Sequence, residues 1–269
     1  MARLDGKVCL ITGGGEGIGR AAAREFARHG AAVVVFDVNP EAGERTAREV
    51  MDVAGDGLFI HGDASVSADV EAAIASVRRR YGKLHVIYNN ASVFLPGQDG
   101  RITEVRPDAW ERILAVNLGS VYLFCHYGIP FLIESGGGSV INTASSAGLI
   151  GVPGCDAYTA SKGATISLTR SLAVEYGPKG VRVNCIAPAA VRTPMLSQSS
   201  LGDSRFDERR FLALRAPLRR YGTAEEIAAV AVFLASDESS YLNGAVITVD
   251  GGVTINGDLS RLPEDGVQG

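Results

Sequence analysis

Short apolar runs rich in valine and isoleucine recur along the chain, separated by longer segments in which apolar residues follow a helical period. Strands that are buried on both faces of a sheet have continuous apolar runs of this kind. The pattern predicts seven strands, at residues 8–11, 32–36, 58–60, 85–88, 139–142, 181–186 and 245–249.

The segments between the apolar runs predict helices near residues 18–29, 41–53, 67–80, 107–131, 156–176 and 224–236. Regular alternation of strands and helices is typical of a parallel sheet that is covered by helices on both faces. No linker, composition shift or internal repeat divides the 269 residues. We therefore expect a single α/β domain over residues 1–269, a doubly wound Rossmann fold with a seven-stranded, mostly parallel sheet.

Two segments fall outside this alternation, residues 189–222 and the tail 253–269. The first follows the sixth predicted strand at the carboxyl edge of the sheet, where ligands bind in open α/β folds, so we expect a substrate lid there. The tail could be disordered or could pack on a neighbouring subunit.

Composition and charge restrict the class of protein. A hydrophobic content of 46% and a charged content of 21% are typical of a soluble globular protein, and a net charge of −4 gives no basic surface for nucleic acid. The cysteines Cys9, Cys125, Cys155 and Cys185 have no metal-binding spacing, so we expect no metal and a reducing compartment. We find neither an apolar run of membrane-spanning length nor a signal-peptide pattern, so we expect a cytoplasmic protein with no membrane partner.

The glycine-rich segment TGGGEGIG, residues 12–19, lies between the first predicted strand and the first predicted helix. Glycines at this place let backbone N–H groups and the helix N-terminus approach a pyrophosphate. A tight turn without a ligand would have the same pattern. We assign Gly13, Gly17 and Gly19 to this role, and we expect the loop residues Gly15, Glu16 and Ile18 to contact the same cofactor.

Asp37 ends the second predicted strand, about 20 residues beyond these glycines, where a carboxylate can accept hydrogen bonds from the adenosine ribose. The negative charge would repel a 2′-phosphate, and the neighbouring Val38 and Asn39 supply no cation, so Asp37 favours NAD. The alternative is that Asp37 only caps the following helix. At the ends of the next two strands, we expect the cofactor contacts Asp63, Ala64, Asn90 and Ala91.

Tyr158 and Lys162 are one helical turn apart in YTASK, so their side chains share a helix face. Ser145 stands thirteen residues before Tyr158, and Asn117 lies in a predicted helix. With the glycine segment and the sequence NNAS at 89–92, this set resembles the short-chain dehydrogenase/reductase family, and the likeness runs from the first strand to ITVDGG at 247–252.

The resemblance implies that Tyr158 is the catalytic acid/base of an alcohol–ketone interconversion and that Ser145 binds the substrate oxygen. Lys162 and a bound nicotinamide would both lower the pKa of Tyr158, and Lys162 would also bind the nicotinamide ribose. The family's helical asparagine corresponds to Asn117, which would support a water relay to the lysine.

After the sixth strand, Pro188, Val191 and Thr193 match the family segment that holds the nicotinamide carboxamide. Two family glycines are replaced, by Ala189 in this segment and by Ser92 in NNAS. We expect these replacements to adjust specificity without abolishing binding, although they could also be silent.

The expected pocket is mostly apolar and is formed by residues 92–95, residues 149–155 and Met195, Phe206 and Phe211 of the lid. An arginine of the lid could reach a substrate anion, the candidates being Arg192, Arg205, Arg209 and Arg210. A hydrophobic secondary alcohol or its ketone, cyclic or steroid-like, is the favoured substrate. The family resemblance also implies a homotetramer built on the long helices 107–131 and 156–176.

Three alternatives stay open at the level of sequence. The main one is an NADPH-dependent ketoreductase, against which Asp37 argues. Another is a regulator that binds NADH without turnover, which would have no need of Ser145, Tyr158 and Lys162. Nucleotide-sugar epimerases share the fold and the Tyr–Lys pair, but they usually have a longer C-terminal part.

Overall fold

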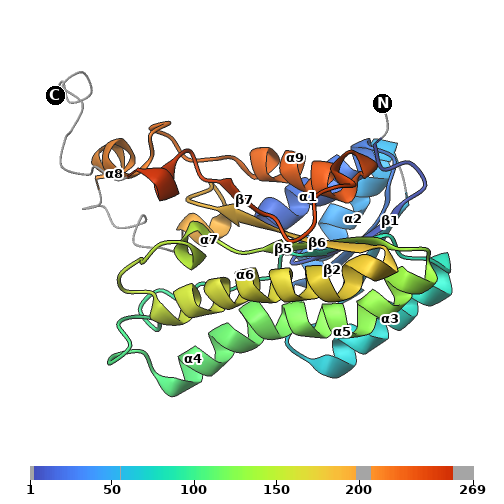
Figure 1. Ribbon diagram of the computed structural model, residues 1–269, viewed down its shortest axis with the longest axis horizontal. Helices are drawn as coiled ribbons and strands as arrows, with labels where there is room; N and C mark the ends of the chain where they lie inside the picture. The colour runs from blue at the N-terminus through green and yellow to red at the C-terminus, as the bar shows by residue number, and fades with distance from the viewer. Residues whose placement is uncertain (1–2, 55, 198–206, 257–269) are drawn as a thin grey trace.

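The computed structural model describes residues 3–54, 56–197 and 207–256, which form a three-layer α/β arrangement (Figure 1). The seven strands form one parallel sheet in the order β3-β2-β1-β4-β5-β6-β7. All seven predicted strands are confirmed, with bounds β1 Val8–Thr12, β2 Ala32–Asp37, β3 Gly57–His61, β4 Val86–Asn89, β5 Gly138–Thr143, β6 Val181–Pro188 and β7 Val246–Val249.

Helices cover both faces of the sheet, as the alternation predicts. On one face α1 packs between α2 and α9 (Figure 1). On the other face α5 packs on β4 and β5, α6 packs on β5 and β6, and α3 lies against α5. The helices are α1 Gly17–Arg28, α2 Pro40–Ala54, α3 Ser67–Tyr81, α4 Pro107–Leu114, α5 Ser120–Glu134, α6 Asp156–Tyr176, α7 Pro194–Ser197, α8 Glu208–Arg215 and α9 Ala224–Ala235. Short turns of helix are η1 Ala115–Gly119, η2 Ser146–Gly148, η3 Gly177–Lys179, η5 Asp237–Ser239 and η6 Val253–Ile255.

The order of the strands creates a cleft at the carboxyl edge of the sheet. From β1 the chain runs outward to β2 and β3, and it then returns to β4 on the other side of β1. The loops that follow the carboxyl ends of β1 and β4 therefore run in opposite directions. This point, where the strand order reverses, is the switch point at which open α/β sheets bind ligands.

The predicted helix 107–131 is longer than expected and is not regular. A π-helical turn, η1, joins α4 to α5 and contains Asn117. By length and composition the whole run Pro107–Glu134 could cross a membrane, contrary to the expectation that no segment reaches this length. However, 56% of its apolar window is buried inside the structure, and a core helix of a soluble protein passes the same test.

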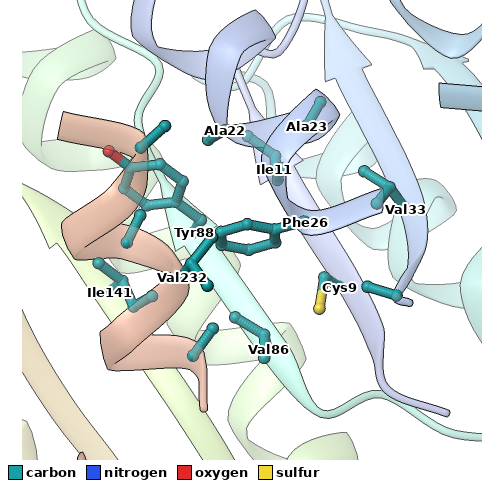
Figure 2. Close-up of a cluster of buried hydrophobic side chains, with 14 of the residues drawn as sticks. Cys9, Ile11, Ala22, Ala23, Phe26, Val33, Val86, Tyr88, Ile141 and Val232 are labelled. Atoms are coloured by element: carbon teal, nitrogen blue, oxygen red, sulfur yellow. The ribbon is translucent and has the colours of Figure 1, made fainter. Parts of the chain in front are cut away.

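A buried cluster between the sheet and α1 and α9 fixes the helix that carries the glycine turn. Phe26 of α1 and Tyr88 of β4 stack with ring centroids 6.3 Å apart, and both are fully buried. Figure 2 shows these two rings together with Ile141 of β5 and Val232 of α9. This packing sets the position of α1, and with it the place where its N-terminus meets the cleft.

The expected lid contains two short helices, α7 and α8, which the sequence pattern did not predict. Helices of 4 and 8 residues are too short to show a reliable period. A bridge between Val191 and Gly222 brings the two ends of the segment together. The predicted lid residues Arg205 and Phe206, and most of the tail 253–269, lie outside the described residues, as do the side chains of Arg210 and Phe211.

Candidate active site

One cavity of about 690 Å³ opens at the switch point and follows the carboxyl ends of the central strands. Most of the predicted site residues line it, whereas Gly15, Gly19 and Asn117 lie behind its wall. The predicted residues in the lining are Gly13, Glu16, Gly17, Ile18, Asp37, Val38, Asp63, Ala64, Asn90, Ala91, Ser145, Tyr158, Lys162, Pro188, Val191 and Thr193.

The glycine turn is held so closely that side chains would not fit. Gly13 has φ +61°, and a Cβ there would lie 2.9 Å from Ala91 Cα. A Cβ on Gly19 would lie 2.0 Å from the carbonyl oxygen of Gly13, so the absence of a side chain lets α1 approach the turn. Gly19 therefore shapes the turn from behind, and Gly13 forms its surface.

The N-terminus of α1 faces the cavity without a cap from its own N-cap residue. Glu16 makes no side-chain capping hydrogen bond, and the first turn of α1 contains no acidic residue. The first N–H groups of a helix lack intrahelical partners and attract anions. With Glu16, Gly17 and Ile18 in the cavity lining, this end of α1 fits a pyrophosphate.

Asp37 is oriented by two backbone groups. Its Oδ2 accepts a hydrogen bond from Gly15 N at 2.8 Å, and its Oδ1 accepts one from Asn39 N at 2.9 Å. A carboxylate has about four acceptor positions, so Asp37 keeps capacity for the hydroxyls of a ribose. The bond to Gly15 also explains how Gly15 contributes without lining the cavity.

Asp63 is held by a neighbour that the sequence analysis missed. Burial by itself would raise the pKa of Asp63, but hydrogen bonds from Ser65 and the Arg112 guanidinium hold that pKa below its ordinary value. Arg112 comes from α4 and also lines the cavity. No motif marks Arg112, and only the packing of α4 beside the β3 loop places it there.

Thr12 joins the two strands that flank the cleft. Its Oγ1 accepts hydrogen bonds from Asn90 N at 3.0 Å and from Ala91 N at 2.9 Å. The side chain of Asn90 donates to the carbonyl oxygens of Thr12 and Gly13, each at 3.2 Å. The residues after β4 thus brace the glycine turn, and the polar side chain of Asn90 is used for that purpose.

Tyr158 and Lys162 lie on one face of α6, with Lys162 Nζ 5.5 Å from the centroid of the Tyr158 ring. Lys162 is 1% exposed, and its Nζ donates to the carbonyl oxygen of Thr143 at 2.9 Å. Burial lowers the pKa of Lys162 to about 8. The predicted pair is therefore confirmed as a spatial neighbour pair inside the protein.

The pKa of Tyr158 differs from the expectation for the working enzyme. Burial raises it to about 12, and a hydrogen bond with Ser145 opposes that increase. In the protein alone, desolvation therefore outweighs the effect expected from Lys162. Ser145 reaches this position because it has an extended backbone just before η2, where its Oγ accepts from Ala147 N.

Asn117 braces the site from behind. Its Oδ1 accepts from Val93 N at 2.7 Å and from Ser92 Oγ at 3.1 Å, and its Nδ2 donates to Val93 O and Ser161 Oγ. These contacts use the acceptor and donor positions of the amide, so the side chain fixes the loop after β4 against α6. A water relay from Asn117 to Lys162 stays a prediction.

The two residues that replace family glycines both line the cavity. Ser92 directs its hydroxyl to Asn117, so the additional polar group has a partner, whereas Ala189 adds only a methyl group. Apolar residues continue the wall beyond Tyr158 and include Val93, Phe94, Leu95, Val152, Cys155, Met195 and Leu196. Of the predicted segment 149–155, only Val152 and Cys155 line the cavity.

The lid arginines that the structure describes do not line this cavity. Arg192 pairs with Glu208 at 3.1 Å and lies over the Tyr221 ring, with 70% of its side chain exposed. Arg209 is exposed on α8. Among the described lining residues near Tyr158 and Ser145, none but Lys162 carries a charge.

Replacing Lys162 with Met is expected to stabilise the fold at pH 7. The folded-state pKa of about 8 lies below the ordinary value of 10.5, so below pH 8 the buried ammonium disfavours the folded state. As the pH rises from 8 to 10.5, the folded protein loses this proton before the unfolded chain does. The penalty therefore shrinks across this range and is gone above it. The variant also loses the hydrogen bond from Lys162 to Thr143, which offsets part of the gain. We expect a net increase of about 2 kcal/mol in the free energy of unfolding at pH 7.

Urea denaturation of both proteins at pH 7 and at pH 10 measures this difference. The gain should shrink at pH 10, and a gain that is equal at both pH values would contradict the buried-charge explanation. Lys179→Met, at an exposed site, is the matched control.

Comparison with known proteins places these features in a family. A family model described as Enoyl-(Acyl carrier protein) reductase matches residues 13–254. A cyclohexanol dehydrogenase of Acinetobacter sp. (strain SE19) is 35% identical over 252 residues, which cover 94% of this chain and 96% of that protein. A meso-2,3-butanediol dehydrogenase of Serratia marcescens is 39% identical over 262 residues, covering 97% and 99% of the two chains.

The fold agrees with a solved structure of the same kind. The crystal structure of a levodione reductase has a TM-score of 0.89 and 36% sequence identity, and the match covers 94% of this chain and 99% of that one. The family model spans Gly13 to Thr254, the range that contains Ser145, Tyr158 and Lys162, and the relatives cover 94% or more of this chain. The chain belongs to the short-chain dehydrogenase/reductase family and is an oxidoreductase that acts on CH–OH donors.

Proposed function

We propose that this protein is an NAD-dependent dehydrogenase that interconverts an apolar, cyclic secondary alcohol and its ketone. The observation that carries this proposal is one cavity lined at one end by the glycine turn and Asp37 and at the other by Ser145, Tyr158 and Lys162. The relatives named for cyclohexanol, levodione and butanediol support the alcohol–ketone chemistry.

The residues present fit a dinucleotide. The N-terminus of α1 would hold the pyrophosphate, Asp37 the adenosine ribose, and Asp63 with Ala64 the adenine side. Pro188, Val191 and Thr193 would hold the nicotinamide end, and Lys162 its ribose. A dinucleotide bound there would supply the hydride acceptor for alcohol oxidation as NAD⁺ and the hydride donor for ketone reduction as NADH.

Tyr158 would take the proton of the substrate hydroxyl during oxidation and return it during reduction. Ser145 would hydrogen-bond the same oxygen and orient it. With a pKa of about 8, Lys162 is mostly protonated at neutral pH, and its charge favours the Tyr158 phenolate. Because burial raises the Tyr158 pKa to about 12, alcohol oxidation should accelerate as the pH rises.

The walls around Tyr158 favour an uncharged substrate. Phe94 packs edge-on against the Tyr158 ring at a centroid distance of 5.4 Å, and Val152, Met195 and Leu196 continue the apolar surface. The cation in this part of the cavity, Lys162, is assigned to the nicotinamide ribose, so a substrate carboxylate or phosphate would lose its hydration without gaining a cation of its own. A compact ring bearing the hydroxyl gains the most from such walls.

The reaction proposal is tested by following NADH formation at 340 nm with three alcohols. These are cyclohexanol (neutral and cyclic), 2-butanol (neutral and acyclic) and a hydroxycyclohexanecarboxylate (cyclic and anionic). We expect turnover of the neutral cyclic alcohol to exceed that of the other two.

Tyr158→Phe should reduce kcat about 10³-fold while NADH still binds, because it removes the proton acceptor and little volume. Wild-type activity in Tyr158→Phe would overturn the role of this residue, and Tyr176→Phe, distant from the cavity, is the control.

Cofactor choice is tested at Asp37. Asp37→Ala should lower kcat/KM for NAD⁺ roughly tenfold, because a charged hydrogen-bond acceptor is lost, and should raise that for NADP⁺ by removing like-charge repulsion. Asp37→Asn keeps one oxygen for Gly15 N and separates turn geometry from charge. An unchanged NAD⁺/NADP⁺ ratio in both variants would show that Asp37 does not select the cofactor, and a preference of the wild type for NADP⁺ would favour the ketoreductase alternative.

We also propose a cytoplasmic homotetramer. The four cysteines are free and buried, which suits a reducing compartment. The run from α4 to α5 lies alongside α6 (Figure 1), and Tyr122 on α5 and Val174 on α6 are 56% and 80% exposed. Multi-angle light scattering should give a mass near four times 28.2 kDa, and a monomer mass would contradict the assembly.

A further inference from the structure

The loop between β4 and α4 carries a carboxylate that is buried against the catalytic helix. Asp99 is 8% exposed although it lies in a loop. Its Oδ1 accepts hydrogen bonds from Gly100 N at 2.9 Å and Ala157 N at 3.1 Å, and its Oδ2 accepts one from Tyr158 N at 3.0 Å. One side chain thus binds the backbone of the residue that carries the catalytic phenol.

These contacts cap α6 from a distant part of the chain. The helix begins at Asp156, and its own N-cap residue, Cys155, makes no side-chain capping bond. The first N–H groups of a helix need an acceptor, and a carboxylate also suits the positive end of the helix dipole. Asp99 supplies that acceptor from 58 and 59 residues earlier in the sequence.

The first residue of α6 also forms hydrogen bonds with this loop. Asp156 Oδ2 accepts a hydrogen bond from Ile102 N at 2.8 Å, and Asp156 N donates to Gly100 O at 3.1 Å. Loop and helix are therefore joined in both directions, and neither can shift without breaking several hydrogen bonds.

The same loop forms the substrate side of the cavity. Val93, Phe94 and Leu95 line it, and Asp99 N donates to Leu95 O at 2.8 Å, which closes a turn directly behind the lining residues. Phe94 meets the Tyr158 ring edge-on at 77°. Asp99 thus connects the wall that would contact substrate with the helix that positions the acid/base.

We propose that Asp99 is a positioning residue that sets both the place of Tyr158 and the shape of the substrate wall formed by residues 93–95. The inference rests on the proposed function of this cavity. Its consequence is that Asp99 controls which alcohols are oxidised, although it does not touch the substrate. A displacement of reacting groups by about 1 Å can cost about 100-fold in rate, and the wall and the phenol would move together.

The experiment compares Asp99→Asn with Asp156→Asn in the full-length protein. Both variants remove one negative charge beside the first turn of α6. Asparagine at 99 has one oxygen and cannot accept from both Ala157 N and Tyr158 N through separate oxygens, as Asp99 does. Asparagine at 156 keeps an oxygen for Ile102 N, so this variant is the matched control for charge.

The first readout is the ratio of kcat/KM for cyclohexanol to that for 2-butanol, which does not depend on the fraction of folded enzyme. We expect this ratio to change about tenfold in Asp99→Asn and to stay within about twofold in Asp156→Asn. The dissociation constant of NADH should stay within about twofold in both, because the glycine turn is untouched. A wild-type ratio in Asp99→Asn, or an equal change in both variants, would overturn the proposal.

The second readout is amide hydrogen exchange of peptides covering residues 155–162, which needs no turnover. Asp99→Asn should accelerate exchange there and leave peptides of α1 unchanged, whereas unchanged exchange at 155–162 would overturn the capping role. If the wild-type protein oxidises neither alcohol, the proposed function fails, and the exchange experiment still decides whether Asp99 fixes Tyr158.

Discussion

The hydrogen bonds that Thr12 Oγ1 accepts from Asn90 N and Ala91 N hold together the two strands between which the chain changes direction. β1 and β4 are adjacent in the sheet although two strands and three helices separate them in sequence. Because their loops diverge from this point, a cleft must open there. The glycine turn forms one side of the cleft, and the loop after β4 continues towards the reaction site on the other.

The N-termini of α1 and α6 lie at this cleft, and they differ in side-chain capping. That of α1 lacks a side-chain cap from its N-cap residue, so its N–H groups remain suited to an anionic ligand. That of α6 is filled by the Asp99 carboxylate, which the protein itself supplies. The first arrangement suits binding, and the second suits a helix that must hold Tyr158 in one place.

Burial determines the electrostatics of the reaction site. It raises the pKa of Tyr158 to about 12 and lowers that of Lys162 to about 8, so in the protein alone both side chains are driven towards their neutral forms. The phenolate that proton abstraction requires is therefore costly until a further positive charge enters the cavity. An oxidised nicotinamide would supply that charge, so proton abstraction would be coupled to cofactor binding.

The sequence by itself determined the strands, the main helices, the glycine turn and the Tyr158–Lys162 pair, because each depends on local periodicity or on a spacing of a few residues. It did not determine the π-turn at Asn117, the short helices of the lid, Arg112 beside Asp63, or Asp99 on the end of α6. Nor did it give the direction of the Tyr158 pKa shift in the protein alone. Tertiary structure decided these features, since desolvation and contacts between residues 49 or 59 positions apart exist only once the layers have packed.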